Sequence, residues 1–323
     1  MHAHPTSLGT NLPTQQRNAN LEEGFVMRAG IPQKSGKLAF HAFNEGYPTM
    51  VSANAFWSTS KEQFVIPEAS DIYETPFALD SAGFVAHLLF KQKGRQKGIA
   101  GVYPWSYQQY IELAGLLAPD WWSQPDMATE DAIAGNQAEI DYRIDATATL
   151  LEGTLRIVYA WQNELARSES TDLVQNMLKP PIPIIQGRRT CDYKRSLDLL
   201  MQVWSRWQPW LAEPTLIGVG SVCRRHLQDP DEGLYAILQG LEGQLPTGSK
   251  VHLFGVKGAA LDEVQKLSWV ASADSLAWDY SARINARKGG YSNTNKHRAT
   301  EMTRWMQSAS RRIAAKPQLS LAL

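Results

Sequence analysis

The sequence predicts an α/β fold, specifically a (β/α)8 TIM barrel with a polar N-terminal arm and a basic C-terminal helical extension. Three features of the 323 residues indicate this fold: short, nearly continuous apolar segments, amphipathic segments between them, and polar or glycine residues directly after several apolar segments. A hydrophobic content of 43% is sufficient for the large core of a single barrel.

The apolar segments are the predicted strands. Their composition is typical of parallel strands that are buried on both faces of a sheet. In chain order they are Lys37–Phe43, Thr49–Phe56, Phe77–Ser81, Trp121–Met127, Pro181–Gln186, Thr215–Gly220 and Val251–Val256. Residues 1–36 are mostly polar, so we expect them to form an arm that contributes little to the core.

Helices are predicted between the strands, where apolar residues recur at spacings of three and four. The longest stripes are Ile144, Ala148, Leu151, Leu155, Val158 and Leu165, and then Tyr193, Leu197, Leu200, Trp204, Trp207 and Leu211. A shorter helix is predicted over Ala260–Trp269, with acids early and a lysine late, which suits the helix dipole. We therefore place the barrel domain at residues 37–282 and the extension at residues 283–323.

Several predicted strands end in polar or glycine residues, among them Asp80, Asp126, Gln186, Gly218 and Gly255. In a barrel the carboxyl ends of all strands open onto one mouth, where catalytic groups collect. The sequence contains no Gly-rich dinucleotide loop, Walker loop, zinc-protease motif or serine-hydrolase motif. We therefore expect a site of another kind at this mouth.

Composition also limits the function. Cys191 and Cys223 are the only cysteines, which are too few for a disulfide framework or a four-thiolate zinc site. No apolar run reaches the roughly 18 residues of a membrane span, and the N-terminus lacks the apolar core of a secretory signal. We expect a cytoplasmic protein with no membrane partner.

Charge is distributed unevenly along a chain whose net charge is zero. Residues 283–316 contain nine lysines and arginines against one acid, Glu301, so this segment carries +8 and the rest of the chain −8. A basic segment on an acidic body favours a polyanionic partner, although a solvated helix rich in Lys and Arg would give the same composition.

Five short segments at strand ends, and one aspartate, occur in a recognisable order between about Tyr47 and Arg283. They are Asp80-Ser81-Ala82-Gly83, Pro125-Asp126-Met127, Ile184-Ile185-Gln186-Gly187, Gly218-Val219-Gly220-Ser221, and His252-Leu253-Phe254-Gly255-Val256 with Asp274 18 residues after Val256. This order resembles the queuine/guanine tRNA transglycosylase superfamily. The closest likeness is to its DNA-modifying branch, the 7-deazaguanine DNA transglycosylases called DpdA.

Departures from the tRNA enzymes favour the DNA branch. Those enzymes carry three cysteines and a histidine that bind zinc after the nucleophile, whereas this chain has no cysteine after Asp274 and only His297. Ala82 stands where the tRNA enzymes have glycine. The resemblance is to a compact version of the kind that bacteriophages carry, and it implies neither a metal nor an organic cofactor.

The resemblance implies an exchange of guanine in DNA for a 7-deazaguanine base, which would protect viral DNA from restriction. Asp274 would be the nucleophile that forms a covalent glycosyl-enzyme, and Asp80 would be the acid/base group. Such a division suits two neighbouring carboxylates, because each shifts the pKa of the other. Without the resemblance, Asp274 would equally suit a helix cap or the surface.

The same resemblance implies a base-binding set and a nucleic-acid-binding set. Asp126 would accept hydrogen bonds from the N1–H and 2-amino groups of guanine, and Gln186 or backbone N–H groups near Val219 would donate to O6. The full set of implied base-binding residues is Asp126, Gln186, Gly187, Val219, Gly220 and Ser81. Phosphate contacts are expected from Arg188, Arg189, Arg224, Arg225, Arg283, Arg287, Lys288, Lys296 and Arg298, with Arg311 and Arg312 further along. Trp278, Tyr280 and Tyr291 are candidates for stacking on bases.

Three other functions remain open. The chain could act on tRNA without a zinc site, serve as a non-catalytic barrel subunit that binds nucleic acid, or be a barrel glycosidase with the same carboxylate pair. A scaffold needs neither Asp80 nor Asp274, and a glycosidase gives the basic segment no task. The sequence leaves open which 7-deazaguanine is inserted, because cyano, amidino and aminomethyl groups project from the same ring position.

Overall fold

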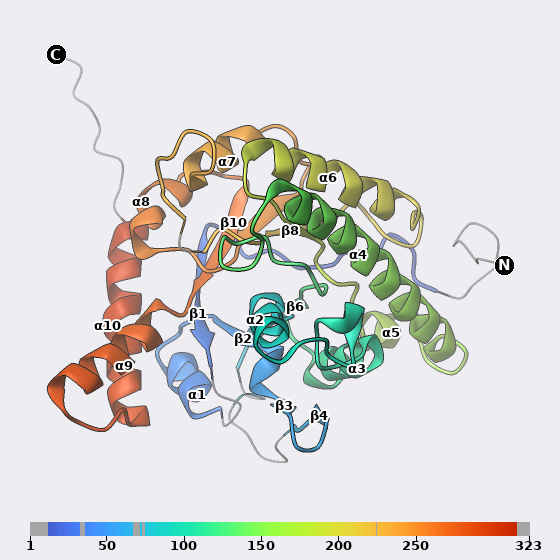
Figure 1. The fold of residues 1–323 in the computed structure, drawn as a ribbon. Helices are drawn as coiled ribbons and strands as arrows, with labels where there is room; N and C mark the ends of the chain where they lie inside the picture. The colour runs from blue at the N-terminus through green and yellow to red at the C-terminus, as the bar shows by residue number, and fades with distance from the viewer. Residues whose placement is uncertain (1–11, 33–35, 67–71, 73–74, 224, 315–323) are drawn as a thin grey trace.

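The centre of the molecule is a sheet of eight parallel strands (Figure 1). The structure is a computed structural model that describes residues 12–32, 36–66, 72, 75–223 and 225–314. The strands are β1 (Val26–Ile31), β2 (Thr49–Ser52), β5 (Phe77–Asp80), β6 (Trp121–Trp122), β7 (Ile184–Ile185), β8 (Leu216–Val219), β9 (Lys250–Leu253) and β10 (Val270–Ser275). They pair in the order β6-β5-β2-β1-β10-β9-β8-β7. The first and last of these strands along the chain, β1 and β10, therefore lie side by side in the middle of the sheet.

The two end strands of this order, β6 and β7, are joined by hydrogen bonds between residues beside them. Ser123 and Ile182 form a parallel bridge. The N–H of Ile182 donates to the carbonyl of Trp122 (2.8 Å), and the N–H of Gln124 donates to the carbonyl of Ile182 (3.1 Å). The sheet is therefore curled, and these bonds link the segments beside its two end strands.

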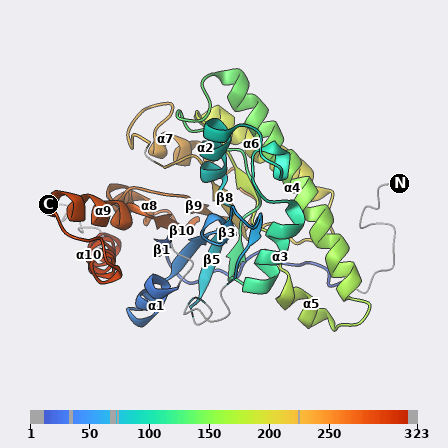
Figure 2. The same cartoon turned by 60° about the horizontal axis from the view of Figure 1, so that its bottom comes forward.

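Helices follow most strands and cover the outer face of the sheet (Figures 1 and 2). They are α1 (Lys37–Asn44), α2 (Gly83–Lys93), α3 (Tyr107–Leu117), α4 (Gln137–Leu165), α5 (Thr171–Met177), α6 (Thr190–Ser205), α7 (Leu234–Leu241), α8 (Leu261–Val264), α9 (Ala277–Gly289) and α10 (Asn295–Ala314). Between β2 and β5 the chain forms a short hairpin, β3 (Trp57–Ser58) and β4 (Gln63–Phe64). Among the described helices, none is long and apolar enough to cross a membrane.

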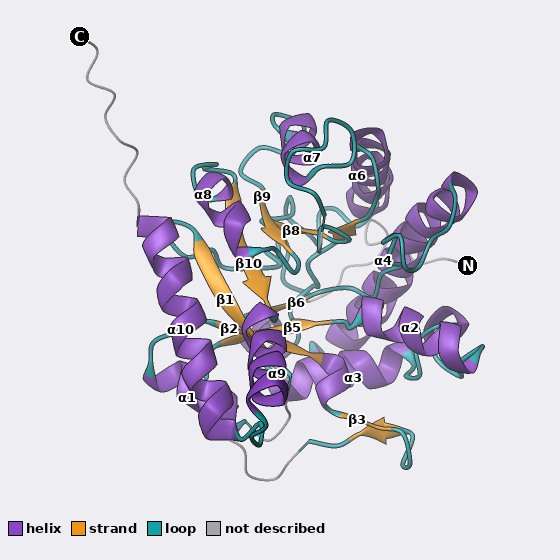
Figure 3. Ribbon diagram, turned by 60° about the vertical axis from the view of Figure 1, so that its left-hand side comes forward, coloured by secondary structure: helices purple, strands orange, loops and turns teal. Residues whose placement is uncertain are grey.

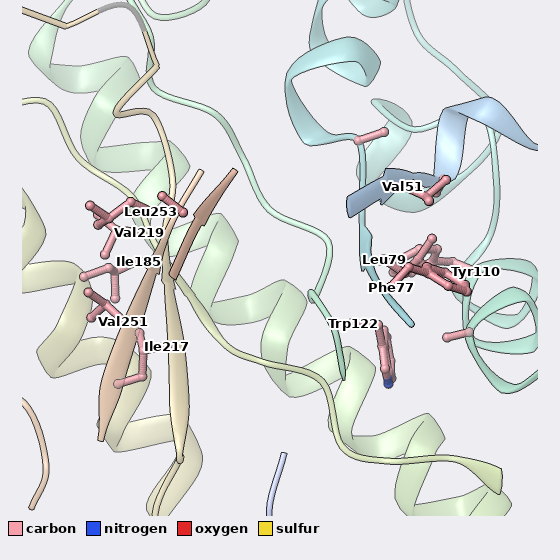
Figure 4. Packing of buried hydrophobic residues seen from close by; sticks show 14 of the residues in the cluster. Val51, Phe77, Leu79, Tyr110, Trp122, Ile185, Ile217, Val219, Val251 and Leu253 are labelled. Carbon is pink, nitrogen blue, oxygen red and sulfur yellow. The ribbon is translucent and has the colours of Figure 1, made fainter. Parts of the chain in front are cut away.

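Side chains alternate between the two faces of each strand and form two separate cores. Toward the helices, Val51, Leu79, Ile185, Ile217, Val219, Val251 and Leu253 belong to one large buried cluster, part of which Figure 4 shows. Toward the inside of the curl, Met50, Ala78, Trp121, Ile184, Leu216 and Ala271 form a smaller cluster. Burying each large apolar side chain contributes about 1.5–3 kcal/mol to folding, so both faces hold the sheet in shape.

The predicted strand at Lys37–Phe43 is wrong, because these residues lie in helix α1. Its buried residues are Leu38, Ala39 and Ala42, which is the spacing of a helical face rather than of a strand. The expectation that residues 1–36 contribute little core is also wrong for residues 26–31. They form β1 in the middle of the sheet, and the short apolar run was hidden by Arg28 and Gly30.

Other predicted elements are shifted in length. The strands predicted at Thr49–Phe56 and Trp121–Met127 end at Ser52 and Trp122, and β10 was not predicted as a strand. The long helix α4 and the helix α6 occur where the apolar stripes predicted them. Asn136 caps the start of α4, because its side chain accepts a hydrogen bond from the N–H of Glu139.

The basic extension is packed against the rest of the fold. Helix α10 contacts α1, α8 and α9, and Figure 3 shows it beside α1. Its residues Met302 and Met306 are buried in the large core. The boundary predicted at residue 282 falls inside α9, which starts directly after β10.

Candidate functional site

A cavity of about 660 Å³ lies at the carboxyl ends of the strands. Its lining includes residues at or beside the carboxyl ends of several strands, among them Ser52, Asp80, Gln186, Gly220 and Asp274. The residues were expected to meet there, because parallel strands that curl into one sheet direct their carboxyl ends to one side. The cavity is therefore the candidate active site.

Asp274 lies near the end of β10, and its side chain is 14% exposed. Its Oδ1 accepts a hydrogen bond from the backbone N–H of Gly255 (2.8 Å) and lies 3.4 Å from Nε2 of His252. Gly255 has a positive φ of 74°, and a Cβ there would meet Cys223 at 3.1 Å, so a glycine suits this turn. Both contacts involve Oδ1, and no residue in the described part of the chain forms a hydrogen bond or an ion pair with Oδ2.

His252 is a functional candidate that the sequence reasoning missed. It is fully buried in β9, and burial lowers its pKa, so the ring is neutral near pH 7. Its Nδ1 lies 2.8 Å from the hydroxyl of Ser272. If that hydroxyl donates to Nδ1, the ring proton sits on Nε2 and points toward Asp274. A histidine inside an otherwise apolar predicted strand, one residue before the end of β9, was the only signal in the sequence.

Asp80 is the last residue of β5 and lines the same cavity as Asp274. The pKa of Asp80 is raised from 3.8 to about 7. Burial is the largest cause of this shift, and the negative charges of Asp126 and Asp274 contribute to it. The backbone N–H of Ala82 acts in the opposite direction. The structure thus brings together the two carboxylates predicted for catalysis and makes one of them a weak acid near neutral pH.

Asp126 is held by several hydrogen bonds. The hydroxyl of Ser81 donates to its Oδ1 (2.9 Å), and Nε2 of Gln186 donates to its Oδ2. The hydroxyl of Tyr103 accepts from the N–H of Asp126 and donates to its carbonyl. Burial raises the pKa of Asp126 to about 6. Gly83 is required beside it, because a Cβ there would lie 2.4 Å from Oδ1.

The hydrogen bonds continue from Gln186 to a further acid, Glu130. The hydroxyl of Ser221 lies 2.6 Å from Oε1 of Gln186 and 2.9 Å from Oε2 of Glu130, and it accepts from the N–H of Thr129 (2.8 Å). Burial raises the pKa of Glu130. Sequence reasoning missed Glu130, because it lies in an irregular loop after β6 where no pattern marks it.

The other predicted base-binding residues take different places. Gly220 lines the cavity and cannot carry a side chain, because a Cβ would lie 2.3 Å from Nε2 of Gln186. Its N–H donates to the carbonyl of Ile185, so it is not available to a base. The side chain of Val219 is in the core, and the carbonyl of Gly187 accepts from Thr129 and Arg225. Of the donors that were predicted for O6 of a base, the side chain of Gln186 therefore remains a candidate.

The arginines near the mouth mostly hold loops. Arg225 donates to the carbonyls of Ser221, Gly187, Arg188 and Glu232. Arg188 is 15% exposed and donates to the carbonyl of Ala134 (2.5 Å), with Asp131 as its ion-pair partner. Arg189 is 52% exposed and lies near Asp231 and Glu232. Arg224 and Lys316 lie outside the described residues.

Cations of the C-terminal helices divide into two groups. Arg283, Arg287, Lys288 and Lys296 are exposed, and so are Arg311 and, in part, Arg312, which pairs with Asp262. Arg298 is buried against Asp279 (2.6 Å) and joins α10 to α9, so its geometry does not suit a phosphate contact.

Of the aromatic candidates for stacking, Tyr280 is 61% exposed and Tyr291 49%. The guanidinium of Arg283 lies 5.9 Å from the ring centre of Tyr280. Trp278 is fully buried, and its Nε1 donates to the carbonyl of Gly30, so it belongs to the core. His297 contacts the ring of Tyr291 and the carbonyl of Ala282. In the described residues no group of three or more His, Cys, Asp or Glu is arranged to hold a metal ion.

Comparison with known proteins agrees with the predicted resemblance. A search of curated proteins finds no match. A scan against protein families matches residues 45–320, which include the cavity residues from β2 onward, to DpdA, described as DeoxyPurine in DNA protein A. This match covers most of the chain and confirms the predicted family. The chain belongs to the DpdA family and has a DNA-modifying, transglycosylase-like role.

Proposed function

We propose that this protein replaces guanine in DNA by a 7-deazaguanine base through a covalent glycosyl-enzyme, with Asp274 as the nucleophile and Asp80 as the acid/base group. The observation that carries the proposal is the pair of carboxylates in one cavity, of which Asp80 has a pKa of about 7. An acid/base group acts best when its pKa is near the working pH. A nucleophilic carboxylate, in contrast, must be ionised.

In the first half of the reaction, Oδ2 of Asp274 attacks C1′ of the nucleotide while the bond from C1′ to N9 of guanine breaks. The protonated carboxyl of Asp80 gives its proton to the leaving base. The N–H of Gly255, together with His252, holds Oδ1, and this aims the other oxygen into the cavity. The product is an ester between Asp274 and the sugar, together with free guanine.

In the second half, the incoming 7-deazaguanine loses its N9 proton to the carboxylate of Asp80. N9 then attacks C1′, and the ester bond to Asp274 breaks. Asp274 returns as a carboxylate and Asp80 as an acid, so both groups are ready for another cycle. A base is thus exchanged for a base without net consumption of a proton.

Recognition of the base follows from the hydrogen-bonding groups that Asp126 and Gln186 offer. Asp126 offers carboxylate oxygens to the N1–H and 2-amino groups of guanine. Gln186 has a second hydrogen on Nε2, besides the one donated to Asp126, and this hydrogen suits O6. A base without these groups would leave buried polar atoms unpaired, which disfavours binding.

The DNA surface is proposed on helices α9 and α10, because α9 begins directly after the strand that carries Asp274. Arg287, Lys288 and Lys296 are exposed there, and Tyr280 offers a face for stacking. At the cavity rim, the apolar Leu276 is 42% exposed and could replace the stacking partner of an extruded nucleotide. We leave Arg298 and Arg225 out of this surface.

The fold is proposed to be a closed (β/α)8 barrel, which the bonds between Trp122, Gln124 and Ile182 support. The proposed biological role is protection of DNA from restriction enzymes, which follows from the resemblance stated above.

The test is the incorporation of labelled guanine by the purified protein, with DNA and tRNA as parallel substrates. We expect label in DNA, and we expect Asp274→Ala to abolish it while the thermal unfolding curve keeps its shape. Asp198→Asn, an exposed change on α6, is the matched control. Label only in tRNA would overturn the substrate, and full activity in Asp274→Ala would overturn the mechanism. Binding without exchange would favour a non-catalytic subunit.

A further inference from the structure

Glu130 is a cavity-lining acid that the proposed exchange does not use. Acidic side chains outnumber basic ones among the described residues of the lining: Asp80, Asp126, Glu130, Asp131, Asp229, Glu232 and Asp274 against Arg225 and His226. The N–H groups of Arg225 donate to backbone carbonyls, and no described residue forms an ion pair with Glu130. An acidic cavity of this kind suits a ligand that brings a positive charge.

Glu130 is the last group in a hydrogen-bonded row that starts at Asp126. The row runs from Asp126 to Gln186, then to Ser221, and then to Glu130. Guanine-type bases present their groups in a matching order along one edge: the 2-amino group and N1–H, then O6, then the substituent on C7. If Asp126 takes the first two and Gln186 takes O6, the C7 substituent faces Ser221 and Glu130.

The hydrogens in this row leave Glu130 weakly satisfied. The oxygen of Ser221 accepts from the N–H of Thr129 and has one proton to give. That proton is shared between Oε1 of Gln186 (2.6 Å) and Oε2 of Glu130 (2.9 Å), because Ser221 is the donor in both contacts. Burial raises the pKa of Glu130, so its ionised form is costly unless a cation binds beside it.

We propose, resting on the exchange function proposed above, that Glu130 binds the C7 substituent of the incoming 7-deazaguanine and selects a cationic amine or amidine over a neutral nitrile. A cation beside Glu130 stabilises its carboxylate form, and a proton held by Glu130 leaves to solvent when the cation binds. The resulting charge-assisted hydrogen bond is stronger than any bond that a nitrile nitrogen can accept from Ser221 or Glu130. The charged groups that act on Glu130 are Asp126 in its own loop, Arg143 on α4 and Arg225 after β8.

The test measures binding of free bases to the full chain by titration calorimetry, without DNA. The probes are guanine, 7-aminomethyl-7-deazaguanine and 7-cyano-7-deazaguanine. We expect the aminomethyl base to bind about tenfold more tightly than the cyano base, since a hydrogen bond to a charged group contributes about that much. Titration in two buffers of different ionisation enthalpy should show that the aminomethyl base releases a proton on binding.

Variants assign the preference to a residue. Glu130→Gln should reduce the tenfold ratio between the two bases to about one. Asp198→Asn is the control, because it removes the same charge from an exposed residue on α6 that does not line the cavity. This control should keep the ratio. Thermal unfolding of both variants checks that they fold.

Each result supports or overturns the proposal. Equal affinities, or tighter binding of the cyano base to the unaltered protein, overturn it without any variant. A ratio that survives Glu130→Gln overturns the role of Glu130. If guanine binds and exchanges into DNA but no preference exists, this inference fails and the proposed function stands. If guanine neither binds nor exchanges, the proposed function fails and the inference fails with it.

Discussion

Asp80→Asn should make the protein more stable while it abolishes base exchange. The folded protein raises the pKa of Asp80 to about 7, mainly by burial and then by the charges of Asp126 and Asp274. In the unfolded chain the same carboxyl has its ordinary value of 3.8. The ionised form of Asp80 is therefore disfavoured by folding, and an uncharged amide of the same shape removes that penalty.

The size of the effect follows from linkage. A shift of about three pKa units corresponds to up to about 4 kcal/mol of unfolding free energy. Because the folded-state pKa is raised, the penalty is absent below about pH 4, grows as the pH rises to 7, and is fully present above pH 7. The gain from Asp80→Asn should therefore fall to about 1.5 kcal/mol at pH 5.

The assay is thermal unfolding at pH 5 and pH 8, together with urea unfolding at both. At pH 8 we expect the melting temperature to rise by roughly 5 to 10 °C, and at pH 5 by less than half as much. Asp198→Asn, the exposed control on α6, should shift neither. A loss of stability in Asp80→Asn, or a gain that does not depend on pH, would refute the assignment of a buried, weakly acidic Asp80.

Three further predictions concern the nucleophile, the base and the DNA. Replacing His252 by Phe should lower kcat for exchange about tenfold with little change in KM for DNA, because it removes the polar contact to Oδ1 of Asp274. A larger change in KM than in kcat would contradict this role. The affinity for free guanine should be constant above pH 6 and fall below it, because Asp126, with a pKa of about 6, must be ionised to accept two hydrogen bonds. Calorimetry across this pH range measures the affinity, and a flat profile would exclude Asp126 as the group that binds N1–H and the 2-amino group. Replacing both Arg287 and Lys288 by Glu should weaken DNA binding and lower the slope of log affinity against log salt concentration by about two. Fluorescence anisotropy measures both quantities, and an unchanged affinity at low salt would place the DNA-binding surface elsewhere.

The sequence determined the parallel α/β architecture, because nearly continuous apolar segments alternated with amphipathic helices. Helices α4 and α6 occur where their stripes predicted them. The sequence also located the acids of the site, because Asp80, Asp126 and Asp274 follow apolar segments in an order that resembles one family. Strand lengths were overestimated, since an apolar run continues into buried loops after the last ladder hydrogen bond.

Tertiary structure decided which groups are buried and with whom. Ser221 meets Glu130 across 91 residues, and Asp126 meets Gln186 across 60, so no local pattern could reveal either contact. The sequence predicted phosphate contacts for Arg298, in the basic segment, and for Arg225, near the barrel mouth. In the folded protein Arg298 instead pairs with Asp279, and Arg225 donates hydrogen bonds to four backbone carbonyls. A charge in a sequence has no fixed partner, because its partner is set by the elements that fold beside it. The same reason hid β1, whose place in the sheet depends on β2 and β10 rather than on its own six residues.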